Sequence, residues 1–411
     1  FVRLFALAGK VVILDEVHSY DDFTGSLLER LIGLLLPLNC TVIVLSATLT
    51  EAQRHRLLAN APGKKPLPLV SMNEPVRITG VPAQAEPIAV GCEADPNLHR
   101  KVSVELAEHS FEAQLERAVE VAKNGGCVLW IRNTVDLAQE TWRHVCNSVS
   151  PDIETGLLHS RFLLTDRKKH ETSWLEKMRG GKDSPRPEGC ILVGTQVVEQ
   201  SVDIDADFVI TDLAPADMLL QRLGRLWRKR DTPRPPEITC PEAWVCLPPN
   251  LGAAFAAQNA DEIRSVLGPH AKVYAPHVLL RTLGVWQSLT EIEFPNDISP
   301  ILERTSASAA SDAENLALVA FGKEHADRCA KLKSSADAAT RIWSRPAADD
   351  LESTTRYLEV PTVKLILARS CKTQPGGTIE LVFDDETVPP FHPLEFSLSL
   401  IHISEPTRLR S

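Results

Sequence analysis

The chain has 411 residues, enough for two or three domains, and its 44% hydrophobic and 24% charged residues are typical of globular proteins with hydrophobic cores. Its nine cysteines include no Cys-x-x-Cys pair, which disfavours a disulfide framework or a zinc ribbon and predicts a reducing, cytoplasmic environment. No hydrophobic run reaches the roughly 18 residues of a membrane span, and the first residues form no export signal, so we expect no membrane partner.

The net charge of −10 would disfavour nucleic-acid binding if it were spread evenly along the chain. Lys and Arg instead gather in two stretches, 161–182 and 222–234. We therefore expect local basic surfaces there, of the kind that contact nucleic-acid backbones.

Residues 11–14 are apolar, mostly β-branched, and run directly into Asp15 and Glu16. This pattern predicts a strand of a parallel sheet, buried on both faces. The acidic pair would then lie at the carboxyl end of the strand, where open α/β sheets bind ligands. Asp15 suits the Mg²⁺ of a bound nucleotide, and Glu16 suits the orientation and deprotonation of water. For these two residues alone, a solvated surface turn is the simpler alternative.

Leucines between positions 27 and 36 recur with helical spacing, and a second apolar run at 41–45 ends in Ser46-Ala47-Thr48. The order strand, helix, strand predicts a parallel unit with both polar ends at one edge of the sheet. Ser46 and Thr48 could equally form a turn or the N-cap of a helix that starts at Glu51. The Pro- and Gly-rich residues from 51 to 87 are expected to end the first domain and to form a linker.

Further strands are predicted at 127–131, 157–161, 190–194 and 208–212, alternating with helical segments. This alternation indicates a second parallel α/β domain. Because Arg132, Asn133 and Thr195 follow strand ends, we expect them to face a cleft between the domains and to contact phosphodiesters.

Arg225 and Arg228 lie three residues apart and are expected to share one face of a helix. Two guanidinium groups in this position could bind the γ-phosphate of a nucleotide held by the opposite domain. The simpler alternative is a solvated basic helix end around a buried Trp227.

Four of these segments together resemble a known family. Asp15-Glu16-Val17-His18 and Ser46-Ala47-Thr48 resemble motifs II and III of superfamily-two DExH helicases, Thr195 to Asp205 resembles motif V, and Gln221 to Arg228 resembles motif VI. Residues 7–21 more specifically resemble the helicase–nuclease of type I CRISPR systems.

The resemblance implies an α/β fold with two RecA-like parallel-sheet lobes, the first of them incomplete, followed by a mainly helical C-terminal region. The expected domains are 1–88 for the end of the first lobe, 89–250 for the second lobe and 251–396 for an accessory region. Residues 397–411 resemble translated sequencing-adapter read-through and are expected to be a non-native tail.

The resemblance also implies a function: ATP hydrolysis with Mg²⁺ drives single-stranded DNA translocation that feeds a nuclease, in partnership with an RNA-guided type I CRISPR surveillance complex. It implies a hydrogen bond between His18 and Gln221 across the cleft. The implied catalytic residues are Asp15, Glu16, His18, Gln221, Arg225 and Arg228, and Asp15 is the implied metal ligand. The nucleotide would contact Asp15, Glu16, Asp203, Arg225 and Arg228, and DNA binding and coupling would use Ser46, Thr48, Arg132, Asn133, Thr195, Gln196 and Glu199.

Two elements of such a helicase–nuclease do not occur in the sequence. None of the Gly-Lys pairs continues as the phosphate loop Gly-x-x-x-x-Gly-Lys-[Ser/Thr], and no His-Asp dipeptide is present for the nuclease. We therefore expect a carboxyl-terminal fragment that is inactive alone. The alternatives are a DExH helicase of another nucleic-acid pathway and a non-catalytic pair of lobes that only binds nucleic acid.

Overall fold

The computed structural model describes residues 6–17, 22–59, 76–82, 85–162, 164–183, 186–199, 203–307, 315–339, 370–373 and 379–382. The chain divides into two compact units, residues 1–351 and 352–411. In the second unit, β12 (Ser370–Thr373) and β13 (Ile379–Val382) form an antiparallel pair.

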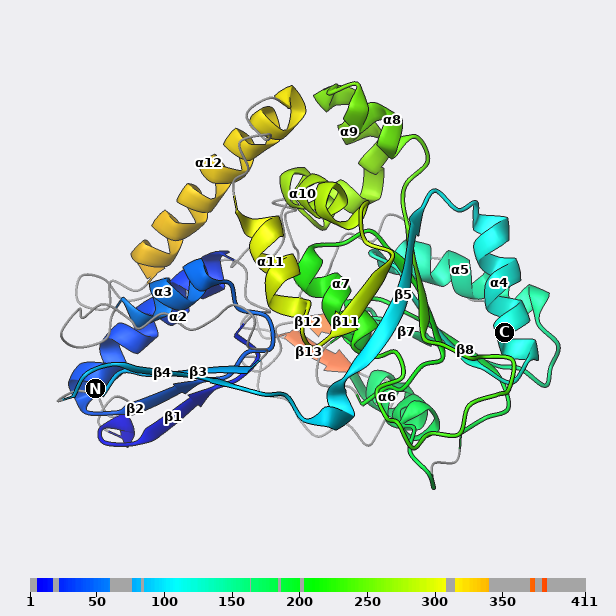
Figure 1. Ribbon diagram of the computed structural model, residues 1–411, viewed down its shortest axis with the longest axis horizontal. Coiled ribbons are helices and arrows are strands. Elements are labelled where there is room, and N and C mark those ends of the chain that lie inside the picture. Colours follow the sequence, from blue (N-terminus) through cyan, green and yellow to red (C-terminus); the bar gives the residue numbers. More distant parts are fainter. Residues whose placement is uncertain are drawn as a thin grey trace. The chain divides into compact units, whose positions relative to one another are not determined.

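The first sheet is the predicted parallel unit. Strands β1 (Val11–Leu14) and β2 (Thr41–Val44) pair in parallel, and α2 (Asp22–Leu35) connects them (Figure 1). Beyond the paired residues, the amide of Leu45 donates to the carbonyl oxygen of Leu14 at 2.8 Å. The acidic pair after β1 and the Ser46 to Thr48 segment after β2 therefore lie at the same edge of the sheet, as predicted.

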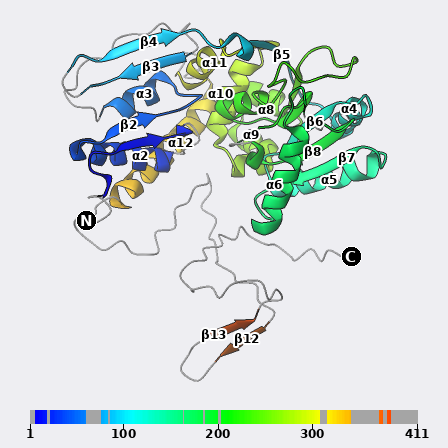
Figure 2. The ribbon, with the colours of Figure 1, turned by 90° about the horizontal axis from the view of Figure 1, so that it is seen from below.

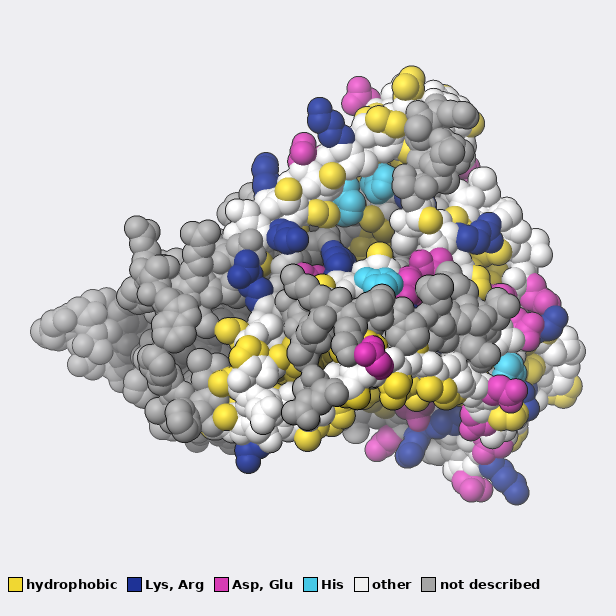
Figure 3. Space-filling model, turned by 60° about the vertical axis from the view of Figure 1, so that its left-hand side comes forward, with side chains coloured by type: hydrophobic (Ala, Val, Ile, Leu, Met, Phe, Trp, Pro, Cys, Tyr) yellow, Lys and Arg dark blue, Asp and Glu magenta, His cyan; other side chains and the backbone are white. Residues whose placement is uncertain are grey.

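The prediction that β1 is buried on both faces is wrong for the described residues. Val11 and Ile13 are 61% and 60% exposed, and Ile43 of β2 is 40% exposed. Leu28 and Ile32 of α2 cover only the other face of this two-stranded sheet. Hydrophobic side chains are accordingly visible at the surface in Figure 3. A continuous apolar run is compatible with burial on both faces, but it does not show whether a helix covers each face of the sheet.

The stretch predicted to be a linker contains regular structure. Helix α3 (Glu51–Leu58) starts at Thr50, which forms a reciprocal capping box with Gln53, so the N-cap is Thr50 rather than Ser46 or Thr48. Strands β3 (Val76–Gly80) and β4 (Ile88–Cys92) then form an antiparallel hairpin. The predicted boundary at 88 falls at the first residue of β4, and the domain limits stay a prediction.

The second sheet confirms the predicted parallel α/β domain. It has seven strands in the order β11-β5-β10-β9-β6-β8-β7, and all neighbours are parallel except β11 and β5. Every residue of the three strands β6, β8 and β9 is buried. The strands are β5 (Arg100–Ala107), β6 (Cys127–Ile131), β7 (Glu154–Leu158), β8 (Cys190–Gly194), β9 (Phe208–Asp212), β10 (Glu242–Cys246) and β11 (Glu291–Phe294).

Helices cover both faces of the second sheet (Figure 1). Leu129 and Ile131 of β6 point to a core shared with α6, α7 and α10, whereas Val128 and Trp130 point to a core shared with α4 and α5. This alternation explains why β6 has no polar face. The helices are α4 (Phe111–Lys123), α5 (Val135–Ser148), α6 (Leu164–Met178), α7 (Ala216–Leu223) and α10 (Pro276–Trp286).

The C-terminal region begins with short helices. These are α8 (Leu251–Ala256) and α9 (Ala260–Leu267), and α11 (Ile298–Ser306) follows α10. The long helix α12 (Leu316–Ala339) packs against α2, α9 and α10, and therefore joins the first sheet to the accessory helices (Figure 2). Among the described residues, no helix is long and apolar enough to cross a membrane.

Gly156 provides a test of the packing on the second sheet. A Cβ atom at this buried position in β7 would approach Trp174 of α6 to 2.1 Å, whereas a Cβ at the exposed Gly284 of α10 meets nothing within 4 Å. We expect Gly156→Ala to lower the free energy of unfolding by about 1–3 kcal/mol, because Trp174 must leave its site. Gly284→Ala should raise it by up to about 1 kcal/mol through helix propensity. Thermal unfolding of both variants checks this, and equal midpoints would contradict it.

Candidate functional site

The acidic pair after β1 faces solvent. Both Asp15 and Glu16 are exposed, and the amide of Glu16 donates to Oδ1 of Asp15 at 2.9 Å. Glu16 has a φ of 55°, a left-handed conformation that costs energy in residues other than glycine and is often retained at functional sites. The exposed carboxylate of Asp15 fits Mg²⁺, which usually takes one or two protein carboxylates and completes its shell with phosphate and water. His18 lies outside the described residues.

Motif VI does not continue the helix that was predicted for it. Helix α7 ends at Leu223 and is capped by Gly224, and Trp227 has a φ of 45°. Arg225 and Arg228 therefore do not share a helix face, and this prediction is wrong. The cause is a competing backbone pairing: the amide of Ala206 donates to Arg225 O at 2.8 Å, and the amide of Trp227 donates to Ala206 O at 3.0 Å.

Arg225 is buried against motif V. It is 8% exposed, and its Nη2 donates to the carbonyl oxygen of Glu199 in motif V. Burial, and then the charge of Arg228, lower its pKa to about 10, while Glu16 favours the charged form. The carboxylate of motif II and the guanidinium of motif VI thus come within electrostatic reach of each other from separate sheets.

Arg228 is more accessible than Arg225. Its side chain is 43% exposed, and its Nε lies 3.3 Å from Oδ1 of Asp203. Nζ of Lys229 donates to the other oxygen of Asp203 at 2.8 Å. The structure therefore brings together two of the predicted nucleotide-binding residues, Asp203 and Arg228.

The two basic stretches carry less uncompensated charge than predicted. Many of their Lys and Arg side chains form ion pairs with acidic residues, so part of the positive charge expected at these two surfaces is compensated. Lys168 and Lys169 are exposed. The pairs include Arg161–Asp136, Arg167–Glu171, Lys177–Glu154, Arg179–Asp203 and Arg234–Asp205.

The centre of the second lobe is Arg222, which the sequence analysis did not select. It is 0% exposed, and its Nε lies 2.7 Å from Oε1 of Glu199. Further acceptors for its guanidinium group are Thr211 Oγ1, Asp212 O, Asn133 Oδ1 and Tyr274 OH, at 2.6 to 3.2 Å. Burial alone would lower the pKa of Arg222, but Glu199, Tyr274 and Asp212 together outweigh it and the pKa is raised. The sequence feature that could have pointed to Arg222 is its position next to Gln221 in motif VI.

Asn133 and Arg132 point into the lobe rather than into a cleft. Asn133 is 2% exposed, and its Nδ2 donates to Leu213 O at 2.7 Å. Arg132 Nε donates to Oδ2 of Asp212 at 3.2 Å. Burial raises the pKa of Asp212, but Arg132 and His270 lower it more, so the carboxylate stays charged. Their side chains serve the internal network here, and a phosphodiester contact stays a prediction that this geometry disfavours.

The motif V residues belong to the same network. Thr195 is 2% exposed, and Gln196 Nε2 donates to Asn133 O at 2.9 Å and to Tyr274 OH at 3.2 Å. Glu199 is 3% exposed, and burial raises its pKa while Arg222 opposes the shift. Motifs V and VI are therefore joined through buried polar contacts.

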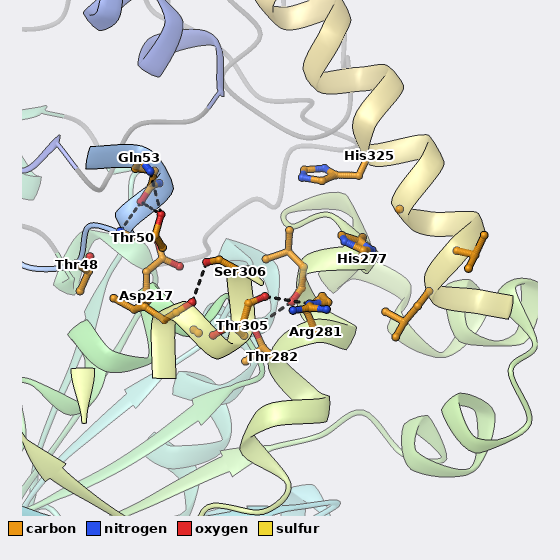
Figure 4. A pocket seen from close by; sticks show the side chains of 16 residues that line it. Thr48, Thr50, Gln53, Asp217, His277, Arg281, Thr282, Thr305, Ser306 and His325 are labelled. Atoms are coloured by element: carbon orange, nitrogen blue, oxygen red, sulfur yellow. Dashed lines mark hydrogen bonds between the residues drawn. The ribbon is translucent and has the colours of Figure 1, made fainter. Parts of the chain in front are cut away.

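Thr48 lines a cavity of about 570 Å³ together with Asp217, His277 and His325 (Figure 4). Thr48 is 5% exposed, and its Oγ1 has no hydrogen-bond partner among the described residues. Burial raises the pKa of Asp217 to about 6. The Nε2 of Gln221 is also buried without a partner in the described part of the chain, and its predicted partner His18 lies outside that part. Ser46 lies two residues after the end of β2.

Comparison with known proteins bears on these motifs. The family model for the C-terminal part of "CRISPR-associated nuclease/helicase Cas3" matches residues 124–231. The CRISPR-associated endonuclease/helicase Cas3 of Escherichia coli K12 is 34% identical over 264 residues, which cover 61% of this chain and 29% of that protein. The chain spans about a third of the length of the curated relatives that it matches.

Solved structures agree. The crystal structure of T. fusca Cas3 with ADP has a TM-score of 0.68 and 28% identity, covering 82% of this chain and 40% of that chain. A chain from a CRISPR RNA-guided surveillance complex in a pre-nicking state has a TM-score of 0.67 and 27% identity, covering 82% of this chain and 42% of that chain. The prediction of an α/β chain with RecA-like helicase folding is confirmed.

The buried pair of Arg222 and Glu199 can be tested by removing one charge. We expect Glu199→Gln to lower the free energy of unfolding by about 3–5 kcal/mol, because it leaves the Arg222 charge uncompensated. Glu120→Gln, which removes the 60% exposed partner of Arg117, should change it by less than about 0.5 kcal/mol. Replacing Arg222 and Glu199 together with methionine should recover much of the loss. Denaturant unfolding measures all three variants. An unchanged free energy of unfolding in Glu199→Gln would show that the Arg222–Glu199 pair is not a buried ion pair that stabilises the lobe.

Proposed function

We propose that this chain, which belongs to the family of CRISPR-associated Cas3 nuclease/helicases, is part of an ATP-driven DNA helicase. It would provide the acidic pair of motif II and the arginines of motif VI to the ATP site. Its substrates would be ATP with Mg²⁺ and single-stranded DNA. The observation that carries the proposal is the contact between motifs V and VI, where Arg225 donates to the carbonyl oxygen of Glu199 and Arg228 pairs with Asp203. The charge of Glu16 after β1 also acts on Arg225, and an ATP site between two lobes needs charges of opposite sign on its two sides.

Each residue has a chemical role in this proposal. Asp15 would bind Mg²⁺, which supplies charge neutralisation on the phosphates when bound. Glu16 would orient the attacking water and accept its proton. Arg225 and Arg228 would stabilise the charge that develops on the γ-phosphate, and Gln221 would orient His18. The desolvation of Arg225 strengthens its interaction with an anion, because little water competes for the guanidinium group.

Coupling to DNA would pass through motif V. The carbonyl oxygen of Glu199 accepts from Arg225, and its carboxylate binds Arg222, so a shift of residues 195–199 against a DNA strand would move both arginines. Thr48 and its cavity offer a second polar surface next to the first sheet. Stepwise closure of two lobes on ATP would then convert hydrolysis into movement along a single strand.

The partners follow from the relatives. The named relatives are nuclease/helicases, and one structural neighbour is part of an RNA-guided surveillance complex. We propose that the helicase acts on single-stranded DNA at such a complex in the cytoplasm and feeds a nuclease. The phosphate loop that an ATPase needs does not occur in the 411 residues, so turnover should be measured on the protein expressed from the complete gene.

Two substitutions test the proposal by steady-state ATP hydrolysis with and without single-stranded DNA. Asp15→Asn removes the metal ligand and should lower kcat by on the order of 100-fold. Arg225→Ala removes charge stabilisation from the transition state and should lower it by on the order of 1000-fold.

Matched controls are Asp136→Asn, at a 76% exposed aspartate, and Arg264→Ala, at a 50% exposed arginine, and both should retain wild-type rates. Wild-type turnover in Asp15→Asn or Arg225→Ala would contradict the assigned roles. Nucleic-acid binding without any ATP turnover in the unmodified protein would favour the non-catalytic alternative.

A further inference from the structure

A buried ion cluster lies directly behind motif VI. Asp205 and Asp207 have side chains that are 0% exposed, and Arg186 and Arg234 have side chains that are 10% exposed. Two carboxylates and two guanidinium groups balance in charge, which is the condition for burying them at moderate cost. The cluster joins the end of motif V to the segment that follows motif VI.

Asp205 contacts motif VI directly. Its Oδ1 accepts from the amide of Arg228 at 2.8 Å, and its two oxygens accept from Nη2 of Arg234 at 2.6 and 2.8 Å. Thr232 Oγ1 donates to Oδ2 of the same carboxylate. The space for this carboxylate depends on Gly180, where a Cβ atom would lie 2.2 Å from Oδ2 of Asp205.

The contact explains how the segment after α7 is held. The backbone pairing of Ala206 with Arg225 and Trp227 fixes one side of the turn, and the bond from Asp205 to Arg228 N fixes the other. Trp227 adopts its positive φ between these two anchors, and the guanidinium carbon of Arg234 lies 5.1 Å from the centre of its ring. A left-handed conformation in a bulky residue persists only where the surroundings enforce it.

We propose that Asp205 is a positioning residue that sets the location of Arg228 relative to the nucleotide. This inference rests on the proposed function, in which Arg228 contacts the γ-phosphate. The Asp205 side chain is fully buried, so in this proposal it acts through Arg228 and not by direct contact with the nucleotide. Its carboxylate connects Arg234 to the backbone of Arg228, so the two oxygens together determine where the Arg228 side chain starts.

Asp207 supplies a matched control within the same cluster. It is equally buried and also binds Arg186 and Arg234, but its second contact is the amide of Cys127, at 2.7 Å, rather than Arg228. A role in stability alone would make Asp205→Asn and Asp207→Asn equivalent. A positioning role would separate them in turnover, because an amide offers one acceptor oxygen where a carboxylate offers two.

The test is a double-mutant cycle on the protein expressed from the complete gene, measured as kcat and KM of DNA-stimulated ATP hydrolysis. We expect Asp205→Asn to lower kcat at least tenfold with KM changed less than threefold. Asp207→Asn should lower the unfolding midpoint by a similar amount but leave kcat within about threefold of wild type. In an Arg228→Ala background, Asp205→Asn should have no further effect on kcat, because it acts through Arg228.

Equal loss of kcat in Asp205→Asn and Asp207→Asn, or an Asp205→Asn loss that multiplies with that of Arg228→Ala, would overturn the positioning role. Wild-type turnover in Arg228→Ala would instead overturn the proposed function. In that case a crystal structure of Asp205→Asn still decides the inference, since an unmoved 225–228 segment refutes it. If Asp205→Asn does not fold, Thr232→Val removes a single bond to the same carboxylate and should give a smaller kcat loss in the same cycle.

Discussion

The second lobe is built around one buried charge, the guanidinium group of Arg222. A fully buried arginine is tolerated only when its donors are satisfied and its charge is balanced. Here the partners come from four separate parts of the chain: Asn133 after β6, Glu199 in motif V, the end of β9 at Thr211 and Asp212, and Tyr274 before α10. Any displacement of one of these segments leaves an unpaired group in a medium of low dielectric constant, so they are constrained to move together.

Because of this constraint, motifs V and VI of the second lobe are held in fixed positions relative to each other. Motif V touches motif VI through Glu199 with Arg222 and Arg225, and a second time through Asp205 with Arg228. The first connection belongs to the buried hydrogen-bond network of Arg222. The second belongs to the buried cluster of two carboxylates and two guanidinium groups that contains Asp205. The arginines proposed to contact ATP therefore lie on a turn that hydrogen bonds hold at both ends, rather than on a free helix end.

The first sheet is organised by a different force. Its acidic pair follows a strand that one helix covers, and the side chains of Val11 and Ile13 remain exposed. The long helix α12 packs on α2 and links this sheet to the accessory helices of the same compact unit. The position of the first sheet within this unit thus depends on the packing of α12 against α2, two helices that are distant from each other in sequence.

The sequence by itself determined the α/β class, the parallel strand pair with its polar ends at one edge, and the four helicase-like motifs. These features depend on local periodicity and on short motifs, which neighbouring residues encode. Only the tertiary structure decided which of the motif residues are buried. It showed Arg222 as a core residue, Asn133 as its partner, and Leu226 on a bridge with Ala206 at the end of motif V instead of a helix. The hydrogen bonds from residues 225–228 to residues 199–206 outweigh the local helical preference of residues 224–228, and no local pattern reports them.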